Sequence, residues 1–235
     1  MLKLVKENLS LISAVMGLMI VLFLLTVFGI RIFQQFKAPQ AIASQGGEVI
    51  SANKPQIKFP EGKYLHPALP IWVVLNDKVR YPYYLQRDEY WKETPIGNTT
   101  ETIGAVGCTI TSLASALTRF GYSYTPATIN SKLLELKGYT ENGYVIWNKI
   151  AELTQNKINV VVVDPSYTRM DQELKAERPV VVKVMLGGMV QHWVLVVAKQ
   201  EHEYWAIDPL NTRQELVKLS SLSDRIYALR IFQVK

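Results

Sequence analysis

The longest uncharged and mostly hydrophobic stretch lies near the N-terminus, where no charged residue occurs from Asn8 to Ile30. About 23 helical residues at about 1.5 Å each span about 34 Å, enough to cross a hydrocarbon core of about 30 Å. A cleaved signal peptide is the competing interpretation, although its apolar region is typically only about 7–15 residues long. The run therefore predicts an uncleaved transmembrane anchor over residues 9–30, after a short N-terminus of residues 1–8.

Basic groups flank both ends of this run. Two lysines and the α-amino group precede it, and Arg31 and Lys37 follow it. Because cytoplasmic flanks carry the excess of Lys and Arg, the pattern leans toward a cytoplasmic N-terminus. Residues 31–70 are rich in Pro, Gly, Ser and Ala and show no lasting period. Their composition predicts a linker to a folded domain over residues 71–235.

Helical periods dominate the first half of that domain. The i, i+3, i+4, i+7 spacing of apolar residues predicts a helix from about Cys108 to Phe120. A second helix is predicted from Thr125 as N-cap, Pro126 at the first helical position and Gly138 beyond the end. The segment "GYVIWNKIAELTQ" predicts a third helix.

Strand patterns stand on both sides of these helices. "IWVVLN" and "VRYPYYLQ" come first, and Pro82 restricts the second to an edge or an irregular path. "INVVVVD" is a continuous β-branched run, which is typical of a buried strand. A short helix "MDQELKAE" and the strands "PVVVKVML", "HWVLVVAK", "EYWAID" and "DRIYALRIFQV" follow. Helices followed by an antiparallel sheet predict an α+β fold.

Composition and charge narrow the function. Hydrophobic residues make up 49 % of the 235 positions and charged residues 20 %, which suits a globular domain with an apolar appendage. The formal net charge is +6; four basic residues against Glu7 supply +3 of it within the first 37 positions. The remaining +3 forms no basic run, so nucleic-acid binding is not expected. No cofactor or metal is expected, because no P-loop, dinucleotide fingerprint or metal-ligand spacing occurs.

Cys108 is the only cysteine, so the chain can form neither an intramolecular disulfide nor a thiolate metal cluster. It follows a glycine at the start of a predicted helix, where unpaired N–H groups and the helix dipole favour a thiolate. A buried structural thiol is the alternative. Cys108 is thus a candidate nucleophile whose base must come from elsewhere in the chain.

Three histidines are available as that base. His66 lies in the predicted linker and His202 at the tip of a predicted hairpin, where solvated surface residues are expected. His192 opens a predicted strand directly after the glycine-bearing loop "MLGGMVQ", at the junction of a rigid and a flexible element. His192 is therefore the candidate base, and a hydrogen-bonded edge histidine is the alternative.

A hairpin after His192 supplies the next candidate. A turn centred on Gln200 would place His192 opposite Asp208, with both side chains on one face and Cβ atoms about 4.5–5.5 Å apart. Asp208 could then fix the tautomer of the ring; the alternative is an aspartate that caps the following turn. The backbone N–H of Cys108, together with Gln86 from an upstream strand end, could stabilise an oxyanion.

Four blocks of this chain resemble, in order, a family of papain-like cysteine peptidases. The blocks are "VRYPYYLQRDEYW", "TIGAVGCTITSLASAL", "GGMVQHWVLVVA" and "YWAIDPLN", and they span roughly Val79 to Asn211. The family is the broad bacterial group related to the domains that remove double-glycine leaders from bacteriocins. Thr109 departs from the small residue that many relatives have after the cysteine. No ABC-transporter domain follows, so leader processing during export is not implied.

The resemblance implies a papain-like fold, in which a helix carrying the nucleophile packs on an antiparallel sheet. By matching position, it implies Cys108 as nucleophile, His192 as general base, Asp208 as the residue that orients it, and Gln86 in the oxyanion hole. We therefore expect a membrane-anchored peptidase or amide hydrolase that acts on a peptide or protein outside the cytoplasm. The alternatives are an inactive membrane-tethered binding module of the same fold and an acyl transferase.

Overall fold

The computed structural model describes residues 70–235. The predicted N-terminal segment, the anchor and nearly all of the predicted linker lie outside the described residues. Within residues 70–235, no helix has the length and hydrophobicity needed to cross a membrane.

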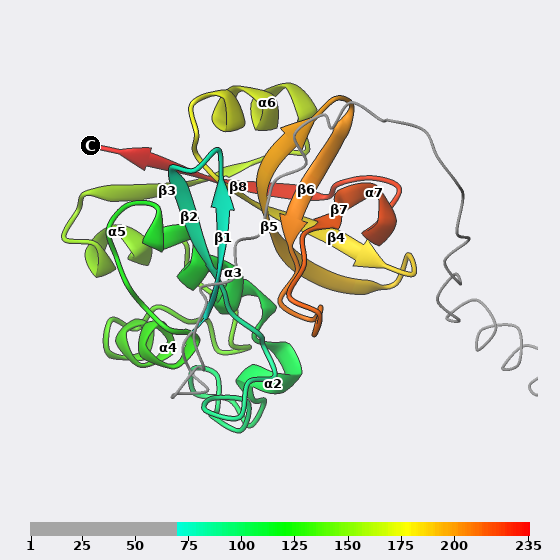
Figure 1. The fold of residues 1–235 in the computed structure, drawn as a ribbon. Coiled ribbons are helices and arrows are strands. Elements are labelled where there is room, and N and C mark those ends of the chain that lie inside the picture. The colour runs from blue at the N-terminus through cyan, green and yellow to red at the C-terminus, as the bar shows by residue number, and fades with distance from the viewer. Residues whose placement is uncertain (1–69) are drawn as a thin grey trace, which may run out of the picture. The chain divides into compact units, whose positions relative to one another are not determined.

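A six-stranded antiparallel sheet forms the centre of the described region, in the order β3-β8-β4-β5-β6-β7 (Figure 1). Its strands are β3 (Ile158–Val163), β4 (Val180–Leu186), β5 (Val190–Gln200), β6 (Glu203–Ile207), β7 (Val217–Lys218) and β8 (Ala228–Val234). The last strand of the chain enters between β3 and β4, so pairing does not follow chain order. Helices before an antiparallel sheet confirm the α+β prediction.

Helices cover both faces of this sheet (Figure 1). On one face α3 contacts β4 and β5, α5 contacts β3, and α4 packs against both helices. On the other face lie α6 and α7. The helices are α2 (Ile103–Val106), α3 (Cys108–Thr118), α4 (Pro126–Glu135), α5 (Lys149–Leu153), α6 (Tyr167–Lys175) and α7 (Leu219–Leu222).

A separate hairpin, β1 (Ile71–Leu75) and β2 (Val79–Tyr83), packs against α3 through β2. The two predicted strands thus form a two-stranded sheet in which every strand is an edge. Pro82 pairs with Trp72 within it. An edge position tolerates the missing N–H of proline, as the sequence pattern predicted.

Burial on both faces explains the continuous apolar run of β5. Trp193, Leu195 and Val197 pack into the cluster that contains α3, whereas Val194 and Val196 pack into the cluster under α6 and α7. Alternate side chains of a strand point to opposite faces, so a strand with helices on both sides needs apolar residues at every position.

The helix that begins at Cys108 agrees closely with its prediction. Its predicted buried positions, Ile110, Leu113, Ala114 and Leu117, are all fully buried. The next helix, α4, begins as predicted: the Thr125 side chain accepts a hydrogen bond from the Thr128 N–H at 3.2 Å. Its end differs slightly, because Lys137 rather than Gly138 takes the left-handed conformation, with φ 53°.

Three predictions about elements are wrong in part. The third helix covers only Lys149–Leu153, because Val145 pairs with Tyr139 in an extended bridge before it. The strand Ile158–Val163 is an edge strand that pairs only with β8, and Val162 on it is 61 % exposed rather than buried. The sequence pattern predicted no element directly before Cys108, where the structure has the short helix α2.

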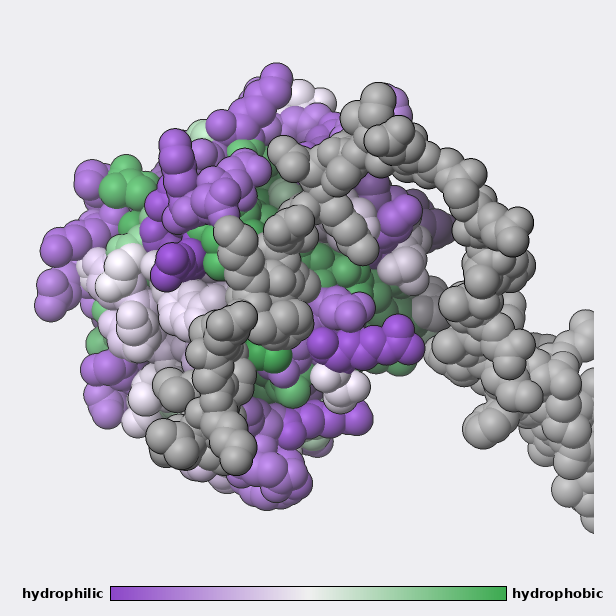
Figure 2. Space-filling model, in the orientation of Figure 1, coloured by the Kyte–Doolittle hydropathy of each residue, from purple (hydrophilic) through white to green (hydrophobic). Residues whose placement is uncertain are grey.

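Figure 2 shows hydrophilic residues over much of the described surface on one face, with hydrophobic residues gathered in smaller patches between them. The large hydrophobic side chains that remain exposed belong to several different elements; they are Tyr90, Val106, Leu134, Tyr144, Val162, Tyr167, Met189, Val190 and Val234. Scattered apolar side chains of this kind are ordinary on a folded surface.

Candidate active site

Cys108 is the first residue of α3, immediately after the short helix α2. Gly107 joins the two helices and donates its N–H to the Ile103 carbonyl at 2.8 Å. A Cβ on Gly107 would lie 2.5 Å from that same oxygen, so the close approach requires glycine. The thiol is partly buried at the edge of the core. Its position at a helix start leaves its own N–H without an intrahelical acceptor.

His192 lies on β5 and is almost completely buried, with 2 % of its surface exposed. Its Nε2 atom lies 2.7 Å from Asp208 Oδ1. The Cys108 side chain lies close enough to the same ring to raise the pKa of His192. Because Asp208 engages Nε2, the nitrogen left for the sulfur is Nδ1. The structure therefore brings the three residues into one chain of contacts, with the imidazole between the other two.

The surroundings of His192 favour its charged form. Burial lowers the pKa of the imidazole, but the hydrogen-bonded carboxylate of Asp208 and the nearby Cys108 side chain raise it by more, to about 9. An opposite charge within hydrogen-bond distance stabilises the protonated ring more than burial destabilises it. At neutral pH the ring is an imidazolium, which is the form that stabilises a neighbouring thiolate.

The predicted hairpin register is wrong, although it brought the correct pair together. The turn consists of Glu201 and His202, with Glu201 at φ 56°, rather than centring on Gln200. The strands pair Gln200 with Glu203, and Val197 forms a β-bulge lower in the ladder. His192 therefore has no directly opposite partner in β6, and Asp208 reaches it from beyond the end of that strand.

The bulge at Val197 is what keeps the pair on one side. Between the bulge and His192, Val196 pairs with Ala206, so the alternation of side chains places Asp208 and His192 on the same face. Without the extra residue, the register between the bulge and the turn, in which Ala198 pairs with Trp205, would continue, and Asp208 would fall on the opposite face. A shift by one residue moves a whole strand's side chains to the other face, and a bulge corrects it locally.

Asp208 also has the second role that its position suggested. Its Oδ1 accepts the Leu210 N–H at 2.9 Å, which caps the turn after β6. The same oxygen meets the His192 ring. Turn capping and contact with the histidine, considered as alternatives for this residue, thus occur together. The cap holds the carboxylate in the orientation that the ring requires.

Gln86 lies in the turn after β2 and is 2 % exposed. Its backbone N–H donates to the Pro209 carbonyl at 2.9 Å, and its Nε2 donates to the Gly104 carbonyl at 3.0 Å. Gln86 therefore bridges the segment that follows Asp208 and the segment that leads into Cys108. One Nε2 hydrogen remains for a further acceptor, and the buried Oε1 has no hydrogen-bond partner within residues 70–235.

Tyr83 is a residue at this site that sequence reasoning missed. It is completely buried on β2, and its hydroxyl contacts both backbone groups of Asp208. It stands in the predicted strand "VRYPYYLQ" beside two other tyrosines. Nothing in the strand period distinguishes it from Tyr81 or Tyr84, so no local signal identified it.

The other candidates lie elsewhere. His66 is outside the described residues, and His202 is an exposed turn residue, as expected. Within the described part of the chain, no group of three or more His, Cys, Asp or Glu side chains is arranged to hold a metal ion.

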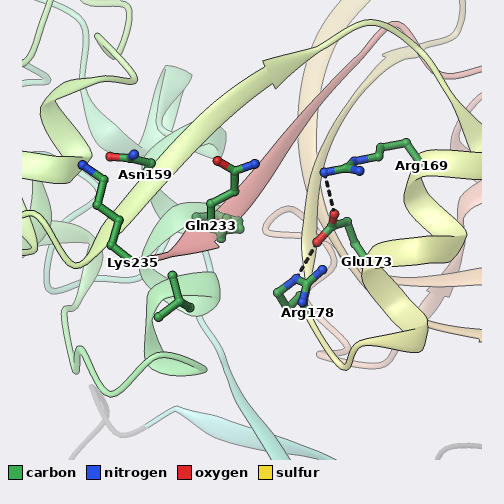
Figure 3. A pocket seen from close by; sticks show the side chains of 8 residues that line it. Asn159, Arg169, Glu173, Arg178, Gln233 and Lys235 are labelled. Atoms are coloured by element: carbon green, nitrogen blue, oxygen red, sulfur yellow. Dashed lines mark hydrogen bonds and ion pairs between the residues drawn. The ribbon is translucent and has the colours of Figure 1, made fainter.

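A pocket of about 520 Å³ lies between α6 and the ends of β3 and β8 (Figure 3). Glu173 is buried in its wall between Arg169, at 3.1 Å, and Arg178, at 2.6 Å. Its other lining residues are Asn159, Phe232, Gln233, Val234 and Lys235. Its volume is in the range of ligand sites, but it contains none of the four candidate residues. The ion pairs account for its charged wall.

Comparisons with known proteins agree with the resemblance seen in the sequence. The model of the Peptidase C39 like family matches residues 78–227. Among solved structures, the peptidase domain of Streptococcus ComA, a bifunctional ABC transporter involved in a quorum-sensing pathway, is 18 % identical with a TM-score of 0.42. That match covers 55 % of this chain and 91 % of the other.

A second solved structure is a Bacillus anthracis protein described as a C39-like peptidase. It is 15 % identical with a TM-score of 0.42, and the match covers 65 % of this chain and 95 % of that one. Among curated protein sequences, none matches this chain. The match of the family model covers all four candidate residues.

Proposed function

This chain belongs to the Peptidase C39 like family, and from that premise we propose that it is a thiol peptidase of papain-like fold. Its substrate is a peptide or protein, and Cys108, His192, Asp208 and Gln86 carry the reaction. The observation that supports this most directly is the buried His192 ring, which bonds Asp208 at 2.7 Å and has its pKa raised by the nearby Cys108 side chain.

Acylation follows from that arrangement. The Cys108 thiolate attacks the carbonyl carbon of the scissile amide, and a carbon–sulfur bond forms. Negative charge develops on the carbonyl oxygen, where the Cys108 N–H and the second Nε2 hydrogen of Gln86 are its donors. The His192 imidazolium gives its proton to the leaving nitrogen as the carbon–nitrogen bond breaks. A thioester acyl-enzyme and a free amine result.

Deacylation reverses the direction of proton transfer. The neutral His192 ring accepts a proton from water, and the resulting hydroxide attacks the thioester carbonyl. The carbon–sulfur bond breaks, the carboxylic acid product leaves, and the thiolate–imidazolium pair returns. Asp208 accepts a hydrogen bond from Nε2 throughout, which keeps Nδ1 directed at the sulfur and stabilises the positive ring.

The test uses iodoacetamide on the full chain, because Cys108 is the only cysteine and all thiol labelling reports on it. We expect rapid alkylation at pH 6, where an ordinary thiol is almost entirely protonated. His192→Gln should slow it by about tenfold or more. His202→Gln is the matched control and should leave the rate unchanged. Slow labelling that His192→Gln does not alter would contradict an activated thiolate and favour a binding module.

We also propose that residues 9–30 anchor the chain in a membrane and that the peptidase domain lies outside the cytoplasm. The support is the uncharged run from Asn8 to Ile30 and the basic groups at its N-terminal flank. The anchor restricts the enzyme to peptides and proteins at the membrane surface.

A further inference from the structure

Tyr83 holds the backbone of Asp208 from the neighbouring hairpin. Its hydroxyl donates to the Asp208 carbonyl at 2.9 Å and accepts from the Asp208 N–H at 3.2 Å. The Glu215 carbonyl is a second acceptor at 3.2 Å. The two residues are 125 positions apart in the chain, so this contact is a tertiary link and not part of a local turn.

The link satisfies backbone groups that no strand satisfies. Asp208 is the first residue after β6 and has left the sheet ladder. Buried backbone N–H and C=O groups are costly when unpaired. A tyrosine hydroxyl can serve both, since it is one donor and also an acceptor. Burial raises the pKa of Tyr83 well above its ordinary value, so the hydroxyl keeps its proton at any working pH.

The same segment carries a second link to the site. Three residues beyond Tyr83, the Gln86 N–H donates to the Pro209 carbonyl at 2.9 Å. In the opposite direction, Gln214 of the segment after β6 donates a hydrogen bond from its Nε2 to the Tyr83 carbonyl at 3.1 Å. The end of β2 and the segment after β6 are therefore joined at three points.

We infer that Tyr83 is a positioning residue, which sets Asp208 against His192 by clamping the Asp208 peptide to β2. This inference rests on the proposed function. Tyr83 touches neither the thiol nor the ring, and it acts through Asp208 alone. Because Gln86 lies on the same segment, the clamp also fixes the distance between the carboxylate and the candidate oxyanion donor.

The test replaces the hydroxyl and keeps the ring. In Tyr83→Phe, the Asp208 N–H loses its partner and the carboxylate loses its alignment, so the His192 pKa should fall by about one unit and alkylation at pH 6 should slow. Tyr81→Phe is the matched control. Tyr81 lies two residues away on the same strand and is equally buried, but the charged side chains that influence its hydroxyl are Arg119 and Glu177 rather than Asp208. It should change neither quantity.

Nuclear magnetic resonance titration of the full chain reads the His192 pKa directly, and His192→Gln assigns its signal among three histidines. This measurement does not depend on catalysis, so it separates failure of this inference from failure of the proposed function. If wild-type Cys108 is not activated, the proposed function fails and the titration still tests the clamp. If the titration curves of Tyr83→Phe and Tyr81→Phe coincide, the clamp is refuted.

Two further variants exclude a merely structural effect. In an Asp208→Asn background, Tyr83→Phe should cause no additional change in the His192 pKa, because its route of action is already lost. Gln214 is partly exposed, and Gln214→Ala removes only its hydrogen bond to the Tyr83 carbonyl. This variant should therefore lower the His192 pKa, but by less than Tyr83→Phe does. Additive effects of Tyr83→Phe and Asp208→Asn would contradict the inference, as would no shift in Gln214→Ala.

Discussion

At the scale of single residues, the site depends on one imidazole that lies between Asp208 and Cys108. Burial by itself lowers the pKa of His192. Asp208 and Cys108 reverse that effect. The charge of the imidazole is therefore coupled to these two neighbours.

The coupling predicts the alkaline limit of activity. Acylation needs the imidazolium, so activity should fall as pH rises through about 9, the pKa of His192. Asp208→Asn removes a negative neighbour, lowers that pKa, and should move the alkaline limb to lower pH while also reducing the maximum rate. Hydrolysis of fluorescently labelled casein across pH 6 to 10 measures both effects. An alkaline limb that Asp208→Asn leaves in place would contradict this assignment.

At the scale of elements, the junction of α2 and α3 sets the position of Cys108, the proposed nucleophile. Gly107 brings the two helices so close that a Cβ would lie 2.5 Å from the Ile103 carbonyl oxygen and 2.7 Å from its Cγ2. The first of these is a backbone atom that already accepts the Gly107 N–H, so it cannot move aside freely. Any side chain at position 107 must displace one helix against the other.

Gly107→Ala is expected to misplace Cys108. Overpacking of this kind costs about 1–3 kcal/mol of stability, and displacement of the thiol should slow alkylation at pH 6 by roughly tenfold or more. Urea unfolding and iodoacetamide labelling measure the two effects separately.

Gly121→Ala is the control at the other end of α3. A Cβ there meets no atom within 4 Å, and the cost arises from its φ of +87°. It should destabilise the protein by about 1–2 kcal/mol and leave labelling unchanged. Wild-type labelling in Gly107→Ala would show that the junction does not position the thiol.

At the scale of the whole molecule, the sheet and the hairpin assemble a site from four distant parts of the chain. The turn after β2 supplies Gln86, the start of α3 supplies Cys108, β5 supplies His192, and the segment after β6 supplies Asp208. The 15 residues between His192 and Asp208 form a hairpin, whose turn geometry brings them together. The other two arrive through packing of β2 on α3.

The proposed anchor makes a prediction at this scale too. The full chain should sediment with membranes, resist extraction by high salt or alkaline carbonate, and dissolve in detergent, because about 20 apolar residues suffice to span a bilayer. A variant without residues 1–30 should remain in the soluble fraction and keep its alkylation rate at pH 6. Recovery of the full chain in the soluble fraction would contradict the anchor.

The sequence by itself determined the chemical inventory and the local helices. One cysteine and three histidines left few choices of nucleophile and base. The buried face of α3 could be predicted because a helix is built from contacts three and four residues apart. The cap at Thr125 is local in the same way. Each of these depends on neighbours that are already adjacent in the chain.

Only the tertiary structure decided the register, the edges and the support of the site. The bulge at Val197 depends on hydrogen bonds between two strands, and the alternation of apolar and polar residues within one strand does not show where an extra residue is inserted. The sequence predicts β3 as a buried strand, but β3 pairs only with β8, from the end of the chain, and lies at the edge of the sheet. The clamp of Tyr83 on Asp208 joins residues 125 positions apart. Such contacts arise when elements pack, and no local pattern encodes them.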